Sequence, residues 1–381
     1  MTTIDLSHFS GYTVRERVKA SHSLLPRIIQ ETNHLILKEL YFIDSYFKIN
    51  NDLIGLAFIN CICFTEKEYE EYANKKLDSR SVLERTTTGF STIVPMFMNL
   101  KLLELFTVLP DNALLKLNTM LIEDTKKKLE VLKLTEQPGQ EILFNKFILR
   151  TVVKETHVKS FTLVASNYNV LPVHLEFLGK CMNYDPNFYS IVPALENITV
   201  YAREGIMDES TVYDLEFFYS YHFIHHIKEF ILGHVNLSSY SIQGLLKAKQ
   251  LKYLDISLTT TTIEREDFYS YYNNQLETLK LYKPDKDVLE FIAKQSSLVR
   301  FEGREINLEE IREYHHLLKF NRTIINFSPR TREMDLILRR NQLVEFQSFF
   351  WLVGGRSHGG IRELPTEIFK LVFSMLFRKI K

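Results

Sequence analysis

Cysteine is scarce in this sequence. Only three of the 381 residues are cysteine, and Cys61 and Cys63 are too close in sequence to form an ordinary structural disulfide. We therefore expect no disulfide scaffold. Long apolar segments are missing too, because polar residues interrupt the stretch 1–12 and no run approaches the roughly 20 apolar residues of a membrane span. These absences favour a protein of the cytoplasm or nucleus that does not enter a membrane.

An excess of either charge is also missing. The 47 basic and 47 acidic side chains cancel, so no overall positive field would attract nucleic acid or an anionic membrane. Hydrophobic residues make up 45% and charged residues 25% of the sequence, which is typical of a globular protein. The length exceeds what one hydrophobic core usually organises, so we expect two domains or a repeat architecture. The balance of charge favours a protein partner over nucleic acid.

Apolar residues recur in the order L-x-x-L-x-L, in which alternation at the last two positions indicates a short strand. The triplets are Leu53/Leu56/Phe58, Leu100/Leu103/Leu105, Leu129/Leu132/Leu134, Val158/Phe161/Leu163, Leu195/Ile198/Val200, Ile227/Phe230/Leu232, Leu251/Leu254/Ile256 and Leu276/Leu279/Leu281, with Leu37/Leu40/Phe42 as a possible ninth. From Ile227 the starts advance to Leu251, Leu276 and Leu298 in steps of 24, 25 and 22 residues. A weaker Ile324/Phe327 pair follows after 26 residues. The late spacing fits a leucine-rich-repeat period.

The first half of the array is less regular. Starts at Leu100, Leu129 and Val158 are 29 residues apart, whereas the intervals 53–100 and 158–195 span 47 and 37 residues. We expect a hidden repeat in the first interval and an insertion in the second.

Helical patterns fill the spaces between the strands. The stretch 66–72 is charged with tyrosines three residues apart, and 285–294 places its apolar residues on one face. A strand followed by a helix leaves two apolar faces that only the next unit covers, so the units stack into a solenoid with parallel strands on its concave side. The chain thus resembles the leucine-rich-repeat family.

The repeat at Leu53 is specific enough to resemble one subclass. Nine positions into it stands Cys61, as in the ribonuclease-inhibitor or cysteine-containing repeats, which have Asn or Cys there. Later units depart from this pattern, since the same position holds Thr259 and Pro284. The segment 318–327 resembles the terminal portion of such arrays, in which N-x-T-I opens a last strand.

The resemblance implies an α/β fold, namely a right-handed leucine-rich-repeat solenoid, or horseshoe, with a helical C-terminal cap. We expect an N-terminal cap over 1–36 and the repeat array over 37–341. A capping helix over 342–353, a glycine-rich linker over 354–360 and an amphipathic helix over 361–381 would complete the chain.

The amphipathic helix carries its own start signals. Pro365 suits a first helical turn, and the sequence Leu-Pro-Thr-Glu-Ile resembles the opening of an F-box and the shortened PRANC segments of poxviral ankyrin-repeat proteins. By that resemblance five residues would contact the adaptor subunit of a cullin ubiquitin ligase: Leu364, Pro365, Ile368, Val372 and Leu376. The alternative is a second capping helix, because an F-box of usual length needs about 40 residues and three helices.

Catalytic and metal motifs are missing from the sequence. His222, His225 and His226 have a spacing that could meet zinc on one helix face, but no cysteine or carboxylate pair completes the site, which favours a surface or interface cluster. No nucleophile elbow, phosphate loop or dinucleotide fingerprint appears. We therefore expect no enzyme activity, no cofactor and no metal.

These patterns together predict an intracellular protein that binds a target protein on its repeat surface. The F-box-like tail would make it a substrate-recruiting adaptor of a cullin ubiquitin ligase. The alternative is a plain leucine-rich-repeat scaffold, or a pathogen effector, that binds its target without ubiquitin chemistry. Tyrosine-rich runs such as 213–221 supply contact area for either role, or pack between repeats.

Overall fold

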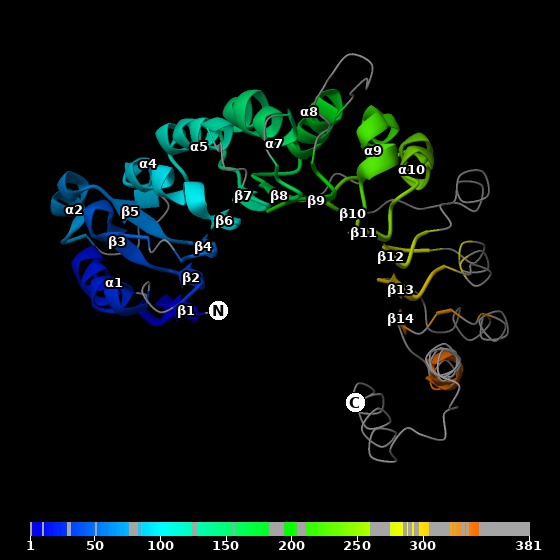
Figure 1. Cartoon of the computed structure of the whole chain (residues 1–381), viewed down its shortest axis with the longest axis horizontal. Coiled ribbons are helices and arrows are strands. Elements are labelled where there is room, and N and C mark those ends of the chain that lie inside the picture. The colour runs from blue at the N-terminus through cyan, green and yellow to red at the C-terminus, as the bar shows by residue number, and fades with distance from the viewer. Residues whose placement is uncertain are drawn as a thin grey trace, which may run out of the picture.

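The computed structural model describes a long arc of repeats (Figure 1). Up to residue 259 the structure describes 2–259, with gaps at 10, 29–31, 50–51, 76–82, 85, 124–127, 155–156, 183–193 and 204–210. After that it describes 275–284, 288, 292, 297–304, 321, 323–324, 326–328, 332 and 335–342. The predicted capping helix from 343 onward, the glycine-rich linker and the amphipathic helix lie outside the described residues.

A single parallel sheet of 12 strands runs through the described part of the arc. In sheet order its strands are β1 (Thr2–Asp5), β2 (His34–Lys38), β4 (Gly55–Ile59), β6 (Leu102–Phe106), β7 (Val131–Thr135), β8 (Ser160–Ala165), β9 (Asn197–Ala202), β10 (Glu229–Gly233), β11 (Tyr253–Leu258), β12 (Thr278–Leu281), β13 (Arg300–Gly303) and β14 (Asn326–Ser328). Every pairing between neighbours is parallel.

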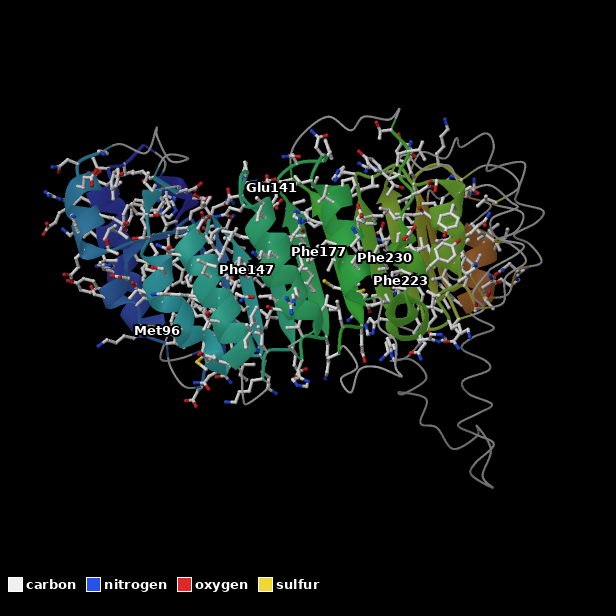
Figure 2. All side chains as sticks on the ribbon, turned by 90° about the horizontal axis from the view of Figure 1, so that it is seen from above. Met96, Glu141, Phe147, Phe177, Phe223 and Phe230 are labelled. Carbon is white, nitrogen blue, oxygen red and sulfur yellow. The ribbon has the colours of Figure 1, made fainter. Side chains whose placement is uncertain are left out.

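Helices cover the outer face of this sheet, and the strands line the inner, concave face (Figure 1). The outer helices are α2 (Glu66–Tyr72), α4 (Phe90–Ile93), η4 (Val94–Asn99), α5 (Asp111–Glu123), α6 (Glu141–Leu143), η5 (Phe144–Leu149), α7 (Arg150–Lys154), α8 (Leu171–Met182), η6 (Glu216–Tyr219), α9 (Tyr221–His226) and α10 (Ser239–Leu246). Seen from the outside, the helical segments lie side by side across the strands (Figure 2). The predicted α/β class and solenoid architecture are confirmed. The fold is a leucine-rich-repeat solenoid.

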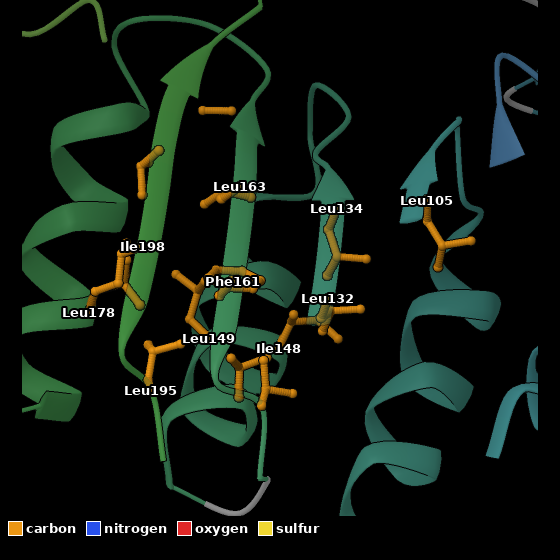
Figure 3. Close-up of a cluster of buried hydrophobic side chains, with 14 of the residues drawn as sticks. Leu105, Leu132, Leu134, Ile148, Leu149, Phe161, Leu163, Leu178, Leu195 and Ile198 are labelled. Atoms are coloured by element: carbon orange, nitrogen blue, oxygen red, sulfur yellow. The ribbon is translucent and has the colours of Figure 1, made fainter. Parts of the chain in front are cut away.

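The core lies between the sheet and the helices, where the last two apolar residues of each triplet point. On β8, Phe161 and Leu163 are fully buried, and Figure 3 shows them facing Ile148 and Leu149 of the outer layer. The same two positions are buried in every predicted triplet from Leu53 to Leu276. One apolar cluster therefore runs lengthwise through the solenoid, as a repeat architecture requires.

The possible ninth triplet, Leu37/Leu40/Phe42, has the wrong register. Leu35 and Leu37, and not Leu40 and Phe42, occupy the inward positions of the strand that pairs with β4. Phe42 belongs to a separate pair of parallel strands, β3 (Tyr41–Ile43) and β5 (Ile62–Phe64). The chain turns at Glu39, which has a φ of 61°, so Leu37 and Phe42 belong to different strands. The Leu-x-x-Leu-x-Phe spacing across this turn is therefore a chance match to the repeat pattern.

The expectation of a hidden repeat within 53–100 is also wrong. β4 pairs directly with β6, so no strand of the main sheet lies between them, and β5, α2 and α4 fill the interval instead. The insertion expected within 158–195 fits the structure, because β8 pairs directly with β9 across that interval. The sheet itself begins at β1, within the segment 1–36.

A buried ion pair fixes the N-terminal helix α1 (Val14–Ile28) to the first repeats. The Arg17 guanidinium donates 2.6 Å and 3.1 Å hydrogen bonds to the Glu39 carbonyl and lies 3.1 Å from its carboxylate. Asn60 donates to the other carboxylate oxygen at 2.9 Å, and Arg17 also stacks over the Tyr41 ring. Because both charges are buried but paired and hydrogen-bonded, the pair holds the turn after β2 in place.

A second buried polar group joins β7 to the outer layer. Glu136 accepts a 2.9 Å hydrogen bond from the Ser166 backbone N–H, and its other oxygen lies 2.6 Å from His174 Nε2. His174 Nδ1 lies 2.7 Å from Asn145 Oδ1, so both ring nitrogens are engaged. Both Glu136 and His174 side chains are completely buried. This network is out of reach of solvent and serves packing between repeats.

The ninth position is buried in two repeats that have different residues there, Cys61 and Thr259. Cys61 Sγ lies 3.2 Å from the Leu37 carbonyl, and the Thr259 hydroxyl donates to the Ile256 carbonyl at 2.8 Å. Both are almost completely buried. A small donor therefore satisfies a strand-end carbonyl in both repeats, which explains why threonine replaces cysteine here.

Polar contacts also close the last described repeat. Asn341 donates to the Ile324 carbonyl at 2.7 Å, and Arg340 donates to the Asn321 carbonyl at 2.7 Å. Asn321 Oδ1 in turn accepts from the backbone N–H of Ile324. These bonds join the helical residues 335–342 to the turn before β14.

The lengthwise core makes a stability prediction. We expect Phe161→Ala to lower the free energy of unfolding by about 3 to 5 kcal/mol, since it leaves a cavity between β8 and the outer helices. Ser160→Ala, on the same strand but on the concave side, is the control and should change stability by less than about 0.5 kcal/mol. Denaturant unfolding followed by circular dichroism measures both. Equal effects of the two substitutions would contradict the assigned strand faces.

Candidate binding surface on the concave face

The concave face is built by the outward positions of the strands. Since side chains alternate along a strand, three positions of each repeat point away from the core, and the parallel register aligns them into rows. The middle row is Thr3, Ile36, Ala57, Glu104, Lys133, Thr162, Thr199, Ile231, Asp255, Lys280, Glu302 and Ser328. Every described repeat therefore contributes to one continuous surface.

Charges of both signs run along the edge where the strands begin. In each repeat from β6 to β12 the residue directly before the strand is charged. These residues are Lys101, Glu130, Lys159, Glu196, Lys228, Lys252 and Glu277. Neighbours form ion pairs between Lys159 and Glu130 at 3.5 Å, Lys228 and Glu196 at 2.9 Å, and Lys252 and Glu277 at 2.9 Å. We call this row the charge ladder. Because it contains four lysines and three glutamates, it presents a polar but nearly neutral border.

Ion pairs also lie on both sides of the centre of the middle row. Lys133 Nζ lies 2.6 Å from Glu104, and Lys280 Nζ lies 3.2 Å from Asp255 and 3.6 Å from Glu302. Burial opposes the charge of Lys280, but hydrogen bonds and the charge of Asp255 outweigh it and raise the pKa of Lys280. The ammonium therefore stays charged between its two acids.

The centre of the middle row carries no charge. There the outward side chains are Thr162, Thr199 and Ile231, on β8, β9 and β10. This uncharged centre lies between the two ionic groups, so a partner that contacts it need not break a salt bridge.

A trough of about 410 Å³ follows the other edge, where the strands end. It is lined from β4 to β11 by Asn60, Phe106, Thr135, Val164, Tyr201, Ala202, Arg203, His234 and Leu258. Aromatic and aliphatic side chains form most of its floor, whereas Arg203 and His234 are polar. Among the described residues that line the trough, none carries a carboxylate.

Two residues at the border of the trough have a left-handed backbone. Asn60 has a φ of 52° and His234 a φ of 67°, each directly after a strand. Asparagine and histidine adopt this region more readily than most side chains do. His234 is held there by its backbone N–H, which donates to the Leu258 carbonyl at 2.8 Å, and its ring packs 5.3 Å from that of Tyr168.

His234 is the most unusual polar group of the trough. Its Nδ1 is buried and has no hydrogen-bond partner among the described residues. Burial and the nearby charge of Arg304 lower the pKa of His234, so the ring is neutral at pH 7. The trough therefore contains a buried unsatisfied polar atom, and the exposed Arg203 lines the same trough.

The outer face has a separate hollow of about 660 Å³. Glu176 and Lys180 of α8, Asp214, Glu216, Tyr219 and Tyr240 contribute to its lining. The acids are already offset in part, because Lys180 Nζ lies 2.5 Å from Glu176 and Lys247 lies over the Tyr219 ring. Among the described residues that line this hollow, none has a buried polar side-chain atom without a hydrogen-bond partner, in contrast to His234 in the trough.

Of the three histidines that the sequence suggested as a surface or interface cluster, His225 and His226 are partly exposed, but His222 is not. His222 is completely buried, and its Nε2 donates to the Leu195 carbonyl at 2.6 Å, while its ring stacks on that of His226 at 4.8 Å. Burial lowers the pKa of His222 to about 4, although the Leu195 carbonyl opposes the shift. Its Nδ1 is buried without a hydrogen-bond partner in the described structure, so a second proton would have no acceptor. His222 supports packing and not metal binding.

Neither a metal centre nor a membrane span appears in the part of the chain that the structure describes. No group of three or more histidine, cysteine, aspartate or glutamate side chains gathers there as ligands would. None of the helices in the described ranges is long and apolar enough to cross a membrane.

The predicted F-box-like contacts lie outside the described residues, so Leu364, Pro365, Ile368, Val372 and Leu376 remain a prediction.

The sequence analysis did not identify the trough or the charge ladder. The ladder had a clear signal, since a lysine or a glutamate directly follows the first apolar residue of each triplet from Leu100 to Leu276. Residues of the trough stand at positions seven to nine of the repeat and share no residue type, so no composition pattern marks them.

No protein-family model and no curated protein sequence matches the chain. Among solved structures, an internalin from Listeria monocytogenes is similar over 86% of this chain and 100% of its own, with 10% identity and a TM-score of 0.37. The actin-binding site 2 of leiomodin-1 is similar over 37% of this chain and 79% of its own, with 17% identity and a TM-score of 0.25. Both similarities are too weak to carry an argument about function.

The buried histidine makes a pH prediction. Because the pKa of His222 falls from 6.5 in the unfolded chain to about 4 in the folded one, the unfolded state binds more protons between these values. The stabilising contribution of neutral His222 is present above pH 6.5 and is lost as the pH falls toward 4. We expect this group to lower the free energy of unfolding by about 2 kcal/mol between pH 7 and pH 5.

His222→Gln should remove that share of the pH dependence, because glutamine keeps a donor for Leu195 but does not titrate in this range. Urea unfolding of the wild type and the variant at pH 7 and pH 5 measures the difference. If both proteins lose the same free energy between the two pH values, His222 is not buried in its neutral form.

Proposed function

We propose that this protein is a scaffold that binds a protein partner on the concave face of its sheet. The observation that carries the proposal is the uncharged centre of the middle row, which lies between two satisfied ionic groups and next to a partly apolar trough. Protein-binding surfaces combine a core with few charges and a polar rim in the same way. The overall charge of zero argues against nucleic acid as the ligand.

The ladder suits the rim of such an interface. Its pairs are about half exposed, and exposed ion pairs contribute only about 0 to 1 kcal/mol to stability. They can therefore exchange partners at little cost when a bound protein approaches. Charges in this position orient an arriving partner and reject unsuitable ones more than they add affinity.

Cross-linking from the concave face tests the proposal. A photoreactive amino acid at Thr199, in the uncharged centre, should give one discrete cross-linked protein in the cells that make the chain. The same group at Ile142, which is 75% exposed on the outer face, is the matched control and should not give that product. Thr199→Arg should reduce co-purification of the identified partner by about tenfold or more, whereas Ile142→Arg should not.

Circular dichroism must first establish that both arginine variants fold. A partner that cross-links equally from the two faces, or binds Thr199→Arg as well as the wild type, would contradict concave-face binding.

The F-box-like tail supports a second, more specific proposal: that the bound partner is passed to a cullin ubiquitin ligase. This proposal depends on the sequence motif alone. Co-precipitation of the ligase adaptor should succeed with the intact chain and weaken about tenfold or more with the double variant Ile368→Ala, Val372→Ala. An intact chain that captures no adaptor leaves the plain scaffold as the function.

A further inference from the structure

The hollow of about 660 Å³ on the outer face lies where the helices of one repeat are short. On one side of it α8 has 12 residues, whereas the next repeat supplies η6 with four residues and α9 with six. The lining residues come from α8, from η6 and its flanks, and from α10, which follow one another along the outer face (Figure 1). A hollow of this volume suits a small ligand or the side chains of a docked segment.

Two stacked tyrosines contribute to the lining of the hollow. The rings of Tyr219 and Tyr240 lie 4.6 Å apart with 21° between their planes, and the Tyr219 hydroxyl donates a 3.0 Å hydrogen bond to the Tyr240 carbonyl. Gly244 makes room for the first ring, because a Cβ atom there would come within 2.5 Å of Tyr219 Cε2. Tyr240 is nevertheless 48% exposed. The ring pair is therefore fixed in place, and part of one ring is open to a ligand.

An internal contact shows which charge this ring pair attracts. Lys247 Nζ lies 4.6 Å from the centroid of the Tyr219 ring, which is a cation–π contact. The face of a tyrosine ring carries negative potential, so a second cation over the exposed part of Tyr240 would be stabilised in the same way.

Carboxylates outnumber cations among the described residues that line the hollow. The acids are Glu176, Asp214 and Glu216, and the cation is Lys180. Lys180 is already shared, because its hydrogen bond to Glu176 and the charge of Glu216 raise the pKa of Lys180. Three acids against one lysine leave a surplus of two negative charges, so the lining favours a cationic ligand.

Neither a metal ion nor the adjoining sequence fits as the counter-charge. In the described ranges no three histidine, cysteine, aspartate or glutamate side chains gather as the ligands of one ion would. The segments 183–193 and 204–210, which follow α8 and β9 closely in sequence, contain four acids and no base. A cation on a long side chain of another molecule can reach carboxylates that do not converge on one point.

We propose that the outer hollow is a second binding surface, which takes a basic segment of a protein partner with an arginine side chain between Asp214, Glu216 and the Tyr240 ring. The inference goes beyond the concave-face function and does not rest on it. Arginine suits the hollow better than lysine, because its planar group stacks on a ring and binds a carboxylate through two hydrogen bonds. The exposed pair of Lys180 and Glu176 contributes little to stability, so it opens easily and frees Glu176 for a further base of the partner.

Peptide selection with a counter-selection tests the inference. Short random peptides displayed on phage are first depleted on the full chain that carries Asp214→Lys and Glu216→Lys, and the unbound phage are then selected on the wild-type chain. We expect the enriched peptides to contain arginine. A selected peptide with a fluorescent label is titrated with the chain by fluorescence anisotropy. Replacing its arginine by glutamine should weaken binding about tenfold or more, and replacing it by lysine should weaken binding less.

Variants of the chain then locate the site. The double variant Asp214→Lys, Glu216→Lys should weaken the labelled peptide about tenfold or more. The matched control is Glu70→Lys, Glu123→Lys, which changes the net charge equally at two exposed acids of α2 and α5 and should leave the affinity within about twofold. Tyr240→Ala should weaken binding about threefold, whereas Tyr240→Phe keeps the ring and should retain it. Circular dichroism establishes that each variant folds.

Several outcomes would overturn the inference. These are the selection of no peptide, the selection of peptides without basic residues, equal weakening by the Glu70→Lys, Glu123→Lys control, or unchanged binding to Tyr240→Ala. A synthetic copy of residues 361–381, which contain five basic and two acidic residues, is tested in the same assay. If this copy binds the wild-type chain more tightly than the selected peptides do, the chain itself occupies the hollow and the assignment to a partner is wrong.

The concave-face proposal and the outer-hollow proposal fail separately. Thr199→Arg should leave the affinity of the labelled peptide within about twofold, because Thr199 lies on the opposite face of the sheet. If Thr199→Arg weakens the peptide about tenfold, the peptide binds the concave face and the assignment to the hollow is wrong. If Thr199 gives no cross-link and the peptide still depends on Asp214 and Glu216, the hollow is a binding surface and the concave-face proposal fails.

Discussion

The whole structure depends on one constraint: two inward apolar side chains of each strand have to be covered by the neighbouring repeats and the helix outside them. Phe161 and Leu163 illustrate it, since both are completely buried by atoms that no single repeat supplies. Parallel pairing follows in a register that keeps the inward positions aligned, because a slip by one residue would turn these side chains to solvent. The register shifts only after Ile231, near the end of β10. The same register aligns the outward positions, so a demand of the core creates the rows of the concave face. Function can then vary along those rows without altering the core.

Much of the fold could be predicted from the sequence because this constraint is written in residue types. The strands from β4 onward appear as apolar triplets, and β13 and β14 follow from spacing alone. Where polar interactions set the chain path instead, the prediction failed. The turn after β2 depends on a positive φ at Glu39 and on the buried Arg17 pair, which join residues 22 positions apart. Local spacing contains no information about such contacts.

The candidate site was less predictable for a related reason. Positions that face solvent are not restricted to one residue type, so the trough brings together Phe106, Val164 and Tyr201 without a shared pattern. The buried histidines show the reverse error. His222 looks like a site residue in the sequence, but it donates to a backbone carbonyl. His174, which is also buried, is bonded on both ring nitrogens. A histidine beside a core strand is more often used to satisfy a buried polar group than to contact a ligand.

The two edges of the concave face differ in how far their polar groups are already satisfied, and this difference determines what each can add to binding. Lysines and glutamates of the ladder pair with each other, so a partner gains only the exchange of one ion pair for another. In the trough, by contrast, His234 Nδ1 lacks a partner among the described residues, and apolar side chains are open to contact. Covering them removes apolar surface from water and supplies a missing hydrogen bond at the same time. Affinity should therefore be concentrated in the trough, whereas the ladder contributes orientation and selectivity.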